Sequence, residues 1–381
     1  MADAHYPADG ELILELDGGK ISGWQQVRVT RGIERFPSDF DISLTEKYPG
    51  SAAEVFVAAG QTCRVRIGND LVLTGYVDRY GCSISANSHT VTIKGRSACE
   101  DIVDSSVLWR NFVINSTNLT DTARKLCEPY GISVSALAGN GPSIPQLTLN
   151  LGETPYQVIE RVARYAAMLV YDDVQGNLVL NTVGSEKMAS GFKQGLNVLA
   201  ASVEYGVDQR YSEYDGFIQS TDSLSDLHGP DSYDGNLKAT VIDPGMKALM
   251  RVDGAPRRRV LSIISEQVDQ QGLYVKRRAA WEMARRYGRS QAVRVEADSW
   301  RDSAGKLWQP NHLAPVNIPA CKLVDQEWVI GDVSYVRDDR GTRAELTLMP
   351  KEAFQPEPVI LNPFAGLFHV ESQRDGRRDQ G

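Results

Sequence analysis

The sequence has few of the residues that build reactive or metal-binding sites. It contains five cysteines and five histidines among 381 residues. An odd number of cysteines with no C-x-x-C pair argues against a disulfide framework, so we expect reduced thiols. No two histidines stand at metal-ligand spacing, and no Cys/His cluster is present. The sequence therefore predicts neither a metal site nor a cofactor.

Long apolar runs and an excess of positive charge are also lacking. No segment approaches 18 uninterrupted apolar residues, and the N-terminus has no basic stretch followed by an apolar core. We therefore expect no membrane insertion and no signal peptide. Asp and Glu together number 49 against 41 Lys and Arg. This balance disfavours a protein whose main task is binding a nucleic-acid backbone, which needs a basic surface.

One short segment holds residue types found in hydrolase sites. Ser299, Asp302, Ser303 and His312 lie within SWRDSAGKLWQPNH. A catalytic triad is defined by spatial roles, so closeness in sequence is weak support. No G-x-S-x-G elbow occurs anywhere in the chain. We interpret the segment as a turn between strands and predict no catalytic residue.

Paired acidic residues could in principle serve a glycosidase. Asp172-Asp173 and Asp338-Asp339 stand in the contexts YDDVQGN and VRDDRG. Asp, Asn and Gly are typical of hairpin turns, so we predict that both pairs form turns.

The N-terminal quarter is typical of short antiparallel strands. Between residues 11 and 101, segments with period-two alternation such as ELILEL and CRVRIG are separated by Gly, Asn and Asp. This spacing indicates a barrel or a sandwich. We predict a first β-barrel domain over residues 1–101.

Helical periodicity begins after residue 101. Residues 119–130 carry apolar side chains on one helical face, and Gly131 is a helix-stop signal. A second helix begins with Thr154 as N-cap and Pro155 at its first position. A hairpin follows, with strands at 168–171 and 178–180. We predict a small α+β domain over 102–190.

Strands resume beyond residue 190. We predict a second β-barrel domain over 191–350, with an insertion at about 217–312. The insertion contains a helix at about 272–287, followed by Gly288, that we expect to dock on the α+β domain. Residues 351–381 form a C-terminal extension, which we expect to be partly disordered. The fold class is therefore α+β, mostly β.

The two strand-rich parts match each other. Residues 29–41 (VTRGIERFPSDFD) align without gaps with residues 203–215 (VEYGVDQRYSEYD). In the same order, CRVRIG with LVLTGYVD aligns with APVNIP and EWVIGDVS. This second match pairs Val65 with Val316, Ile67 with Ile318, Gly75 with Gly331 and Val77 with Val333. The shared order predicts two copies of one β-module.

The ordered segments as a whole resemble the baseplate hub proteins of Mu-like contractile-tailed phages. The likeness rests on GWQQVRVTRGIERFPSDFDIS, LVLTGYVD, NLTDTARKLCEPYGISV, GETPYQVIERVARYAAMLVYDDVQGNLVL and WRDSAGKLWQPN. It extends from about residue 20 to 350. The chain is more distantly similar to the N-terminal part of type VI secretion spike (VgrG) proteins.

The resemblance implies a structural protein of the virion tail baseplate, made and assembled in the host cytoplasm. It implies a homotrimeric ring with pseudo-sixfold symmetry between a hexameric tail tube and a trimeric central spike, in contact with other baseplate proteins. Phage DNA would pass through the ring without specific binding. The alternatives are a tail-associated cell-wall hydrolase and a VgrG-like secretion component.

Two groups of residues are candidates for contacts with partners. Basic residues cluster at 257–259, 276–278, 285–286 and 289. On a helix such residues mostly form a solvated face. The sharper hypothesis is a surface between domains or subunits that pairs with carboxylates, and we expect it to lie away from the channel. Apolar side chains near the C-terminus and in the turn segment are the predicted interface residues: Trp300, Trp308, Phe364, Leu367 and Phe368.

Overall fold

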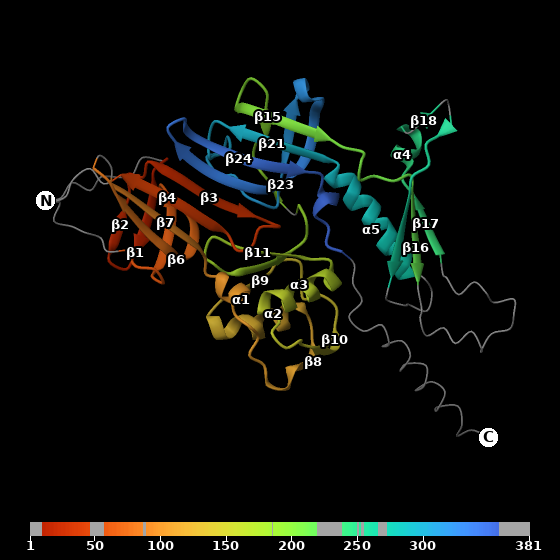
Figure 1. The fold of residues 1–381 in the computed structure, drawn as a ribbon, viewed down its shortest axis with the longest axis horizontal. Coiled ribbons are helices and arrows are strands. Elements are labelled where there is room, and N and C mark those ends of the chain that lie inside the picture. Colours follow the sequence, from red (N-terminus) through yellow and green to blue (C-terminus); the bar gives the residue numbers. More distant parts are fainter. Residues whose placement is uncertain are drawn as a thin grey trace.

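The computed structural model describes residues 10–45, 57–86, 89–184, 186–218, 238–249, 251–252, 255–265 and 273–357. Its strands and helices form four parts (Figure 1). Two strand units lie beside each other, an α+β unit lies below them in this view, and an insertion unit lies at one side.

The first strand unit is antiparallel throughout. Its strands are β1 (Leu12–Leu16), β2 (Gly19–Ile21), β3 (Gln26–Gly32), β4 (Asp39–Thr45), β5 (Thr62–Ile67), β6 (Asp70–Ile84) and β7 (His89–Ser97). They pair in the order β3-β4-β7-β6-β5-β1-β2. The predicted alternation is confirmed on β3, where Val27 and Val29 are buried and Arg28 is exposed. A buried face therefore runs along these strands, as period two requires.

The α+β unit follows directly. It contains α1 (Glu100–Asp104), η1 (Arg110–Phe112), β8 (Val113–Thr117), α2 (Leu119–Cys127), η2 (Glu128–Tyr130), β9 (Val134–Ala136), β10 (Ile144–Thr148), α3 (Pro155–Ala166), β11 (Leu169–Asp172) and β12 (Leu178–Asn181). The predicted start of α3 is confirmed: Thr154 and Gln157 form a reciprocal capping box, with Pro155 at the first position. The predicted hairpin is β11 and β12. Gly131 ends the α2–η2 segment with a left-handed φ of 68°.

The second strand unit is interrupted by the insertion unit. It consists of β13 (Glu186–Lys187), β14 (Phe192–Lys193), β15 (Val198–Tyr205), β21 (Gln291–Ala297), β22 (His312–Ile318), η3 (Pro319–Cys321), β23 (Leu323–Asp338), β24 (Gly341–Met349) and η4 (Lys351–Phe354). The insertion unit holds β16 (Glu213–Ile218), β17 (Lys238–Ile242), α4 (Pro244–Leu249), β18 (Arg251–Val252), β19 (Ala255–Pro256), β20 (Val260–Ser265) and α5 (Leu273–Arg289).

A single sheet runs through both strand units. Its main path is β15-β21-β24-β23-β3-β4-β7-β6-β5-β1-β2, and the units meet where β23 pairs antiparallel with β3. One core cluster accordingly contains buried residues of both units, and the α+β unit has its own cluster. The fold is mostly β, with few helices, as predicted. Among the described strands the path stays open at β15 and β2, so the expectation of two closed barrels is not confirmed.

The strand order repeats between the two units. The first unit contains the path β3-β4-β7-β6-β5, and the second contains β15-β21-β24-β23-β22, in the same chain order and with antiparallel pairing throughout. This supports the expected internal duplication. It also changes one boundary. β21 takes the place of β4, so it belongs to the second unit and the insertion lies between Tyr205 and Gln291.

Part of the aligned sequence therefore needs correction. Residues 213–215 of β16 were matched to residues 39–41 of β4, yet β16 pairs with β17 and β20 in a separate sheet. A similar alternation of residue types produced the false match, since period two marks a strand face and not its partner. The match of Val65 with Val316 agrees with the strand registers, as shown below.

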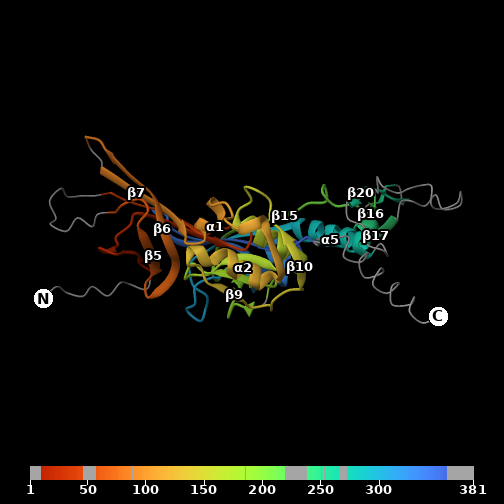
Figure 2. The same ribbon diagram turned by 90° about the horizontal axis from the view of Figure 1, so that it is seen from below.

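Helix α5 also differs from expectation. Its main contacts are with β16, β17 and η4, and not with the helices and strands of the α+β unit on which it was expected to dock. Figure 2 shows it at the end of the molecule opposite β6 and β7. Gly288 was expected to follow the helix but lies inside it. A Cβ at Gly288 would stand 2.3 Å from the backbone nitrogen of Ala353, so the glycine allows η4 to approach closely.

Candidate assembly surfaces

The candidate triad residues are not assembled for catalysis. Asp302 Oδ1 accepts hydrogen bonds from the backbone nitrogens of Ala304 and Lys306, at 2.9 and 3.0 Å. The ring of His312 contacts Glu186 Oε2 at 3.1 Å and the carbonyl of Pro310 at 3.0 Å. These contacts confirm a turn, because an Asp that binds backbone amides two and four residues ahead is a turn former.

Trp300 and Trp308 are part of the subunit's own core. Their side chains are only 2% and 1% exposed. Trp308 Nε1 donates to the carbonyl of Ser299 at 2.9 Å, and its ring packs on Phe192 with centroids 4.5 Å apart. Trp300 Nε1 donates to the carbonyl of Arg343 at 2.8 Å. Neither indole has surface left for a neighbour, so their predicted interface role is not supported.

The other predicted interface residues, Phe364, Leu367 and Phe368, lie outside the described residues. No helix in the described ranges is long and apolar enough to cross a membrane.

The acidic pairs serve structure, and Asp338 Oδ1 accepts from the backbone nitrogen of Arg340 at 2.9 Å, as a turn former does. In the first pair only Asp173 lies in the turn, because Asp172 belongs to β11. Asp173 Oδ1 accepts from the backbone nitrogens of Gln175 and Asn177, which makes the predicted turn. Asp172 is buried and accepts from both the backbone nitrogen and the hydroxyl of Ser38, at 3.1 and 2.8 Å. Burial raises the pKa of Asp172, which the Arg31 charge and the Ser97 and Ser38 hydrogen bonds partly oppose. Asp172 thus ties the α+β unit to the first strand unit.

Cysteines and possible metal ligands form no site in the described part of the chain. All five cysteines are free, and burial raises the pKa of Cys63 and Cys127 to about 12. Such thiols are poor nucleophiles at neutral pH. The described residues contain no group of three or more His, Cys, Asp or Glu placed to hold a metal ion.

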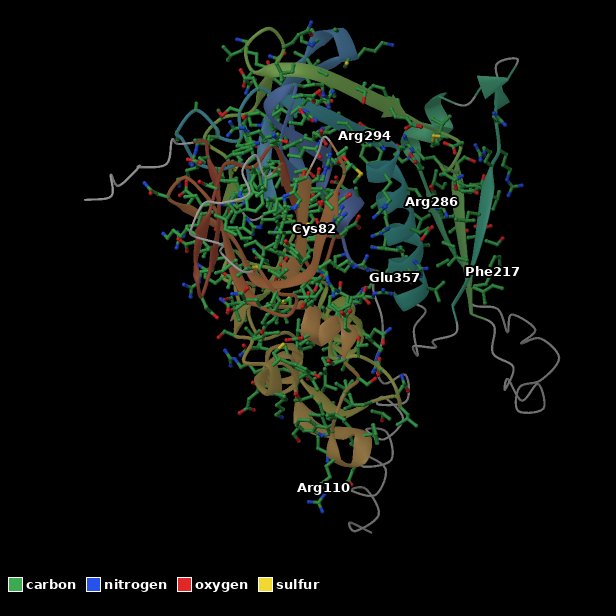
Figure 3. The ribbon with its side chains drawn as sticks, turned by 60° about the vertical axis from the view of Figure 1, so that its left-hand side comes forward. Cys82, Arg110, Phe217, Arg286, Arg294 and Glu357 are labelled. Carbon is green, nitrogen blue, oxygen red and sulfur yellow. The ribbon has the colours of Figure 1, made fainter. Side chains whose placement is uncertain are left out.

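The arginines of α5 are paired within the chain. Arg286 and Arg278 bind Glu282 one turn away, and Arg278 also binds Glu357 at 2.8 Å. Figure 3 shows Arg286 on the side of α5 that faces β16, and Glu357 beside the N-terminal half of the helix. These arginines do pair with carboxylates, but Glu282 belongs to α5 itself, so of these pairs only that of Arg278 with Glu357 joins two parts of the chain, as expected.

Two further arginines of α5 link it to the first strand unit. Arg289 and Arg285 both bind Glu34, which follows β3. Sequence reasoning did not single out Glu34, since a lone glutamate in a loop carries no pattern. Its importance comes only from the approach of α5.

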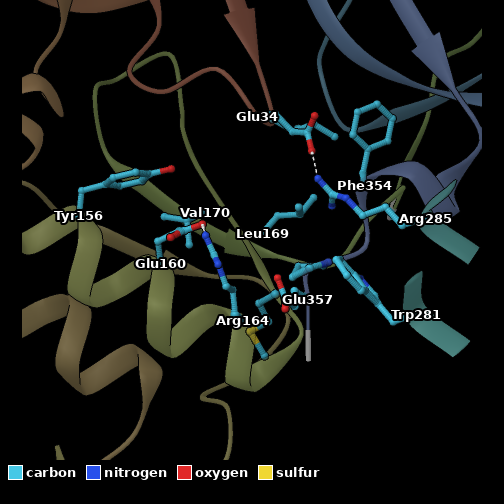
Figure 4. Close-up of a pocket in the computed structure, with 13 residues that line it drawn as sticks. Glu34, Tyr156, Glu160, Arg164, Leu169, Val170, Trp281, Arg285, Phe354 and Glu357 are labelled. Carbon is cyan, nitrogen blue, oxygen red and sulfur yellow. Dashed lines mark hydrogen bonds and ion pairs between the residues drawn. The ribbon is translucent and has the colours of Figure 1, made fainter. Parts of the chain in front are cut away.

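A cleft of about 380 Å³ lies between α3, β11, α5 and η4 (Figure 4). The apolar part of its lining includes Met168, Leu169 and Val170. The charged groups around it are neutralised in pairs, such as Glu160 with Arg164 at 2.5 Å. Because these charged groups are held in ion pairs, none of them is poised to act as acid, base or nucleophile.

The exposed apolar side chains near the open strand edges were not predicted. On β6, Tyr80 is 45% and Ile84 79% exposed; on β15, Leu199 and Tyr205 are 61% and 49% exposed. Beyond Val77, β6 pairs only with β7 among the described strands, and β15 is the end of the sheet path. Open edges that carry exposed apolar residues are typical docking sites for another strand.

The comparisons with known proteins agree with this emphasis on assembly. Three family models match in chain order. They are "Mu phage baseplate assembly protein GpP-like, N-terminal" at residues 11–97, "Baseplate hub protein gp44-like, second domain" at 99–182 and "Mu phage baseplate assembly protein GpP, fourth domain" at 273–357. Baseplate hub protein gp44 of Escherichia phage Mu is 27% identical over 375 residues, covering 96% of this chain and 92% of that protein.

Solved structures show the same relationship. The 43 kDa tail protein of prophage MuSo2 from Shewanella oneidensis matches with a TM-score of 0.79 and 28% identity, covering 91% of this chain and 99% of that one. An E. coli type VI secretion component, described as structurally similar to the T4 tail proteins gp27 and gp5, matches with a TM-score of 0.54 and 11% identity. It covers 91% of this chain and 79% of that one, and at this identity shows a shared fold alone.

Proposed function

The chain is a homologue of the Mu-type baseplate hub proteins, which are structural proteins of the phage tail and not enzymes, and from this premise we propose that it forms a homotrimeric ring joining the tail tube to the central spike. The observation that carries the proposal is the duplicated strand order, β3-β4-β7-β6-β5 and β15-β21-β24-β23-β22.

Duplication offers a way to match symmetries. Three subunits with two similar strand units each present six similar surfaces around one axis. One face of such a ring would fit a hexameric tube, while features that occur once per subunit would fit a trimeric spike. Other baseplate proteins would bind the outside. The domains would be those predicted, at residues 1–101, 102–190 and 191–350, except that β13 (Glu186–Lys187) would join the second strand unit, since it pairs with β22.

Further parts of the proposal concern the lumen, the C-terminal extension and the place of assembly. Phage DNA would pass through the ring without specific binding, which requires a lumen without a basic surface. The pairing of the α5 arginines with Glu34, Glu282 and Glu357 is consistent with this. Phe364, Leu367 and Phe368 in the extension 351–381 would dock on the spike or a neighbouring subunit. Assembly would take place in the host cytoplasm.

The mass of the purified full chain in solution tests the ring. Each chain is 42.0 kDa, so light scattering at rising protein concentration should approach about 126 kDa. A mass of one chain at every concentration contradicts self-assembly. A peptidoglycan hydrolysis assay addresses the tail-hydrolase alternative, and no release of fragments is expected. A type VI role has no observation in its favour beyond the shared fold.

A further inference from the structure

We propose that β15 of one copy pairs antiparallel with the C-terminal half of β6, residues 78–84, of a second copy, in the register that the chain itself uses where β23 meets β3. The inference rests on the ring proposed above and names the strands and residues that would build its subunit contact. Its basis is the internal duplication, which makes one junction of the sheet a template for another.

The strand order gives the first step. In the duplicated order, β3 corresponds to β15 and β6 corresponds to β23. Inside the chain, β23 of the second unit pairs with β3 of the first unit. The equivalent contact is between β6 of a first unit and β15 of a second unit. One chain cannot supply it next to its own β23–β3 junction, because β15 and β6 stand on opposite sides of that junction along the sheet path.

The registers then fix which residues are equivalent. The sequence match of Val29 with Val203 carries across the sheet, strand by strand, and makes Val77 equivalent to Ile330. The equivalent pairs along the way are Phe40 with Val293, Gly95 with Leu348, and finally Val77 with Ile330.

Two independent features confirm this alignment. A β-bulge follows Val77 in β6 and follows Ile330 in β23. The carbonyl of Val77 accepts from Gly60 N at 2.7 Å, and that of Ile330 accepts from Asn311 N at 2.8 Å. Gly60 and Asn311 both have left-handed φ values, 85° and 62°. The earlier match of Val77 with Val333 is thus wrong by three residues.

The match of Gly75 with Gly331 is out by the same three residues, because Gly75 becomes equivalent to Trp328, but the match of the preceding strands agrees with this alignment. Val77 follows Tyr76, which pairs with Thr62, and Ile330 follows Val329, which pairs with Leu313. Counting three residues on from Thr62 in β5 and from Leu313 in β22 makes Val65 equivalent to Val316, as the sequence match predicted.

Side chains at the internal junction are more deeply buried than their equivalents at the two open edges. Within the chain, the β23–β3 junction buries its side chains: Val333, Tyr335 and Val29 are each 0% exposed. Their equivalents are Tyr80, Cys82 and Val203. Tyr80 is 45% exposed, Cys82 is exposed and Val203 is half-buried. The positions that are fully buried at the internal junction are therefore more exposed at the two edges.

The template predicts an explicit register. Inside the chain, Val333 stands opposite Arg31, Tyr335 opposite Val29 and Arg337 opposite Val27. Between copies, the equivalent pairs are Tyr80 opposite Tyr205, Cys82 opposite Val203, and Ile84 opposite Ala201. These pairs are aromatic–aromatic or apolar, which is favourable across antiparallel strands.

The geometry also implies a closed ring. Each copy offers β6 to one neighbour and β15 to another, so the contact is head-to-tail. Head-to-tail contacts give a ring when the rotation closes and a filament when it does not. A ring of three copies alternates internal β23–β3 junctions with β6–β15 contacts. It leaves none of these edges open.

One introduced cysteine is enough to test the register, because Cys82 is native and exposed. Val203→Cys, made in a Cys321→Ser background, should form a disulfide with Cys82 of a neighbouring copy under mild oxidation. Opposite residues on antiparallel strands have Cα atoms about 4.5–5.5 Å apart, within the range of a disulfide. Denaturing gels without reductant should then show covalent dimers and trimers and no longer species.

Two controls isolate the contact. Ser202→Cys in the same background places a thiol one residue away, pointing to the other face, and should cross-link several-fold less. Val203→Cys combined with Cys82→Ser should give no covalent oligomer. In that Cys82→Ser background, Ile84→Cys with Ala201→Cys supplies a second predicted pair, in case Val203→Cys impairs folding.

The outcomes separate the two proposals. Cross-linking at both predicted pairs supports the register. A protein that scatters as a trimer but cross-links at neither pair overturns the β6–β15 contact and leaves the ring standing. If the parent protein stays at 42.0 kDa and the cysteine variants cross-link at neither pair, both the contact and the ring are contradicted.

Discussion

Trp308 allows a decisive test of whether the tryptophans stabilise the subunit or the assembly. Its indole is buried against Phe192 and donates to the carbonyl of Ser299 at 2.9 Å. Trp308→Phe keeps most of the ring contact but leaves that buried carbonyl without this donor. The expected loss in free energy of unfolding is about 1–3 kcal/mol. Trp308→Ala also leaves a large cavity, and the expected loss rises to about 3–5 kcal/mol.

Urea unfolding followed by far-UV circular dichroism measures these losses. All variants must be compared at one protein concentration, because self-association adds stability. The strand units share one core and the α+β unit has another, so the transition of the strand units should shift. Trp109→Phe is the matched control. Its indole also donates to a backbone carbonyl, that of Val113 at 3.1 Å, but it is half-buried and packs on the other core.

The result that refutes the reasoning is specific. If Trp308→Ala leaves the unfolding midpoint unchanged but lowers the mass measured by light scattering, the indole acts between subunits. The core contacts described for Trp308 would then contribute little to the stability of the single chain.

The remaining predictions concern Glu100 and Glu34. Burial, together with the hydrogen bond and charge of Asp78, raises the pKa of Glu100 from 4.5 to about 8. Between these two pH values the folded state binds a proton that the unfolded state has lost. Stability should therefore fall as pH rises from about 4.5 to about 8. Glu100→Gln should flatten this fall and stabilise the protein at pH 8 by about 1–2 kcal/mol, after allowance for solvent screening; an unchanged pH profile of thermal unfolding would contradict this. Glu34→Ala should cost less than about 1 kcal/mol overall but speed amide hydrogen exchange in the C-terminal half of α5. Glu160→Ala, which removes a pair within α3, should not.

The local structure could be predicted from the sequence to a large degree. The capping box at Thr154, the stop at Gly131 and the turn at Asp302 depend on residues within a few positions of each other. The alternation of Val27 and Val29 likewise reports the buried face of one strand. Each of these signals is local, and a local signal survives in a single sequence.

Strand partners could not be predicted in the same way. β21 was assigned to the insertion because 85 residues separate it from β15, with which it pairs. The three-residue error between Val77 and Val333 has a related cause. Alternating apolar residues match one another at shifts of two, and the extra residue of the β-bulge after Ile330 turns a shift of two into one of three. Only the bulge and the bond to Gly60 or Asn311 fix the register. The exposed strand edges could not be predicted for the same reason. Whether an edge residue is exposed depends on whether another strand pairs with it, and the local sequence does not show this.

The place of the insertion gives the duplication its asymmetry. In the first unit, six residues join β3 to β4; in the second, the equivalent connection from β15 to β21 holds the whole insertion unit. These two connections touch, because Glu34 lies in the short one and Arg285 and Arg289 lie in the long one. In a ring of three copies, the strand units would repeat six times while short and long connections alternate. The sheet would then be nearly sixfold and the insertion side strictly threefold, so a single chain could carry both symmetries on different surfaces.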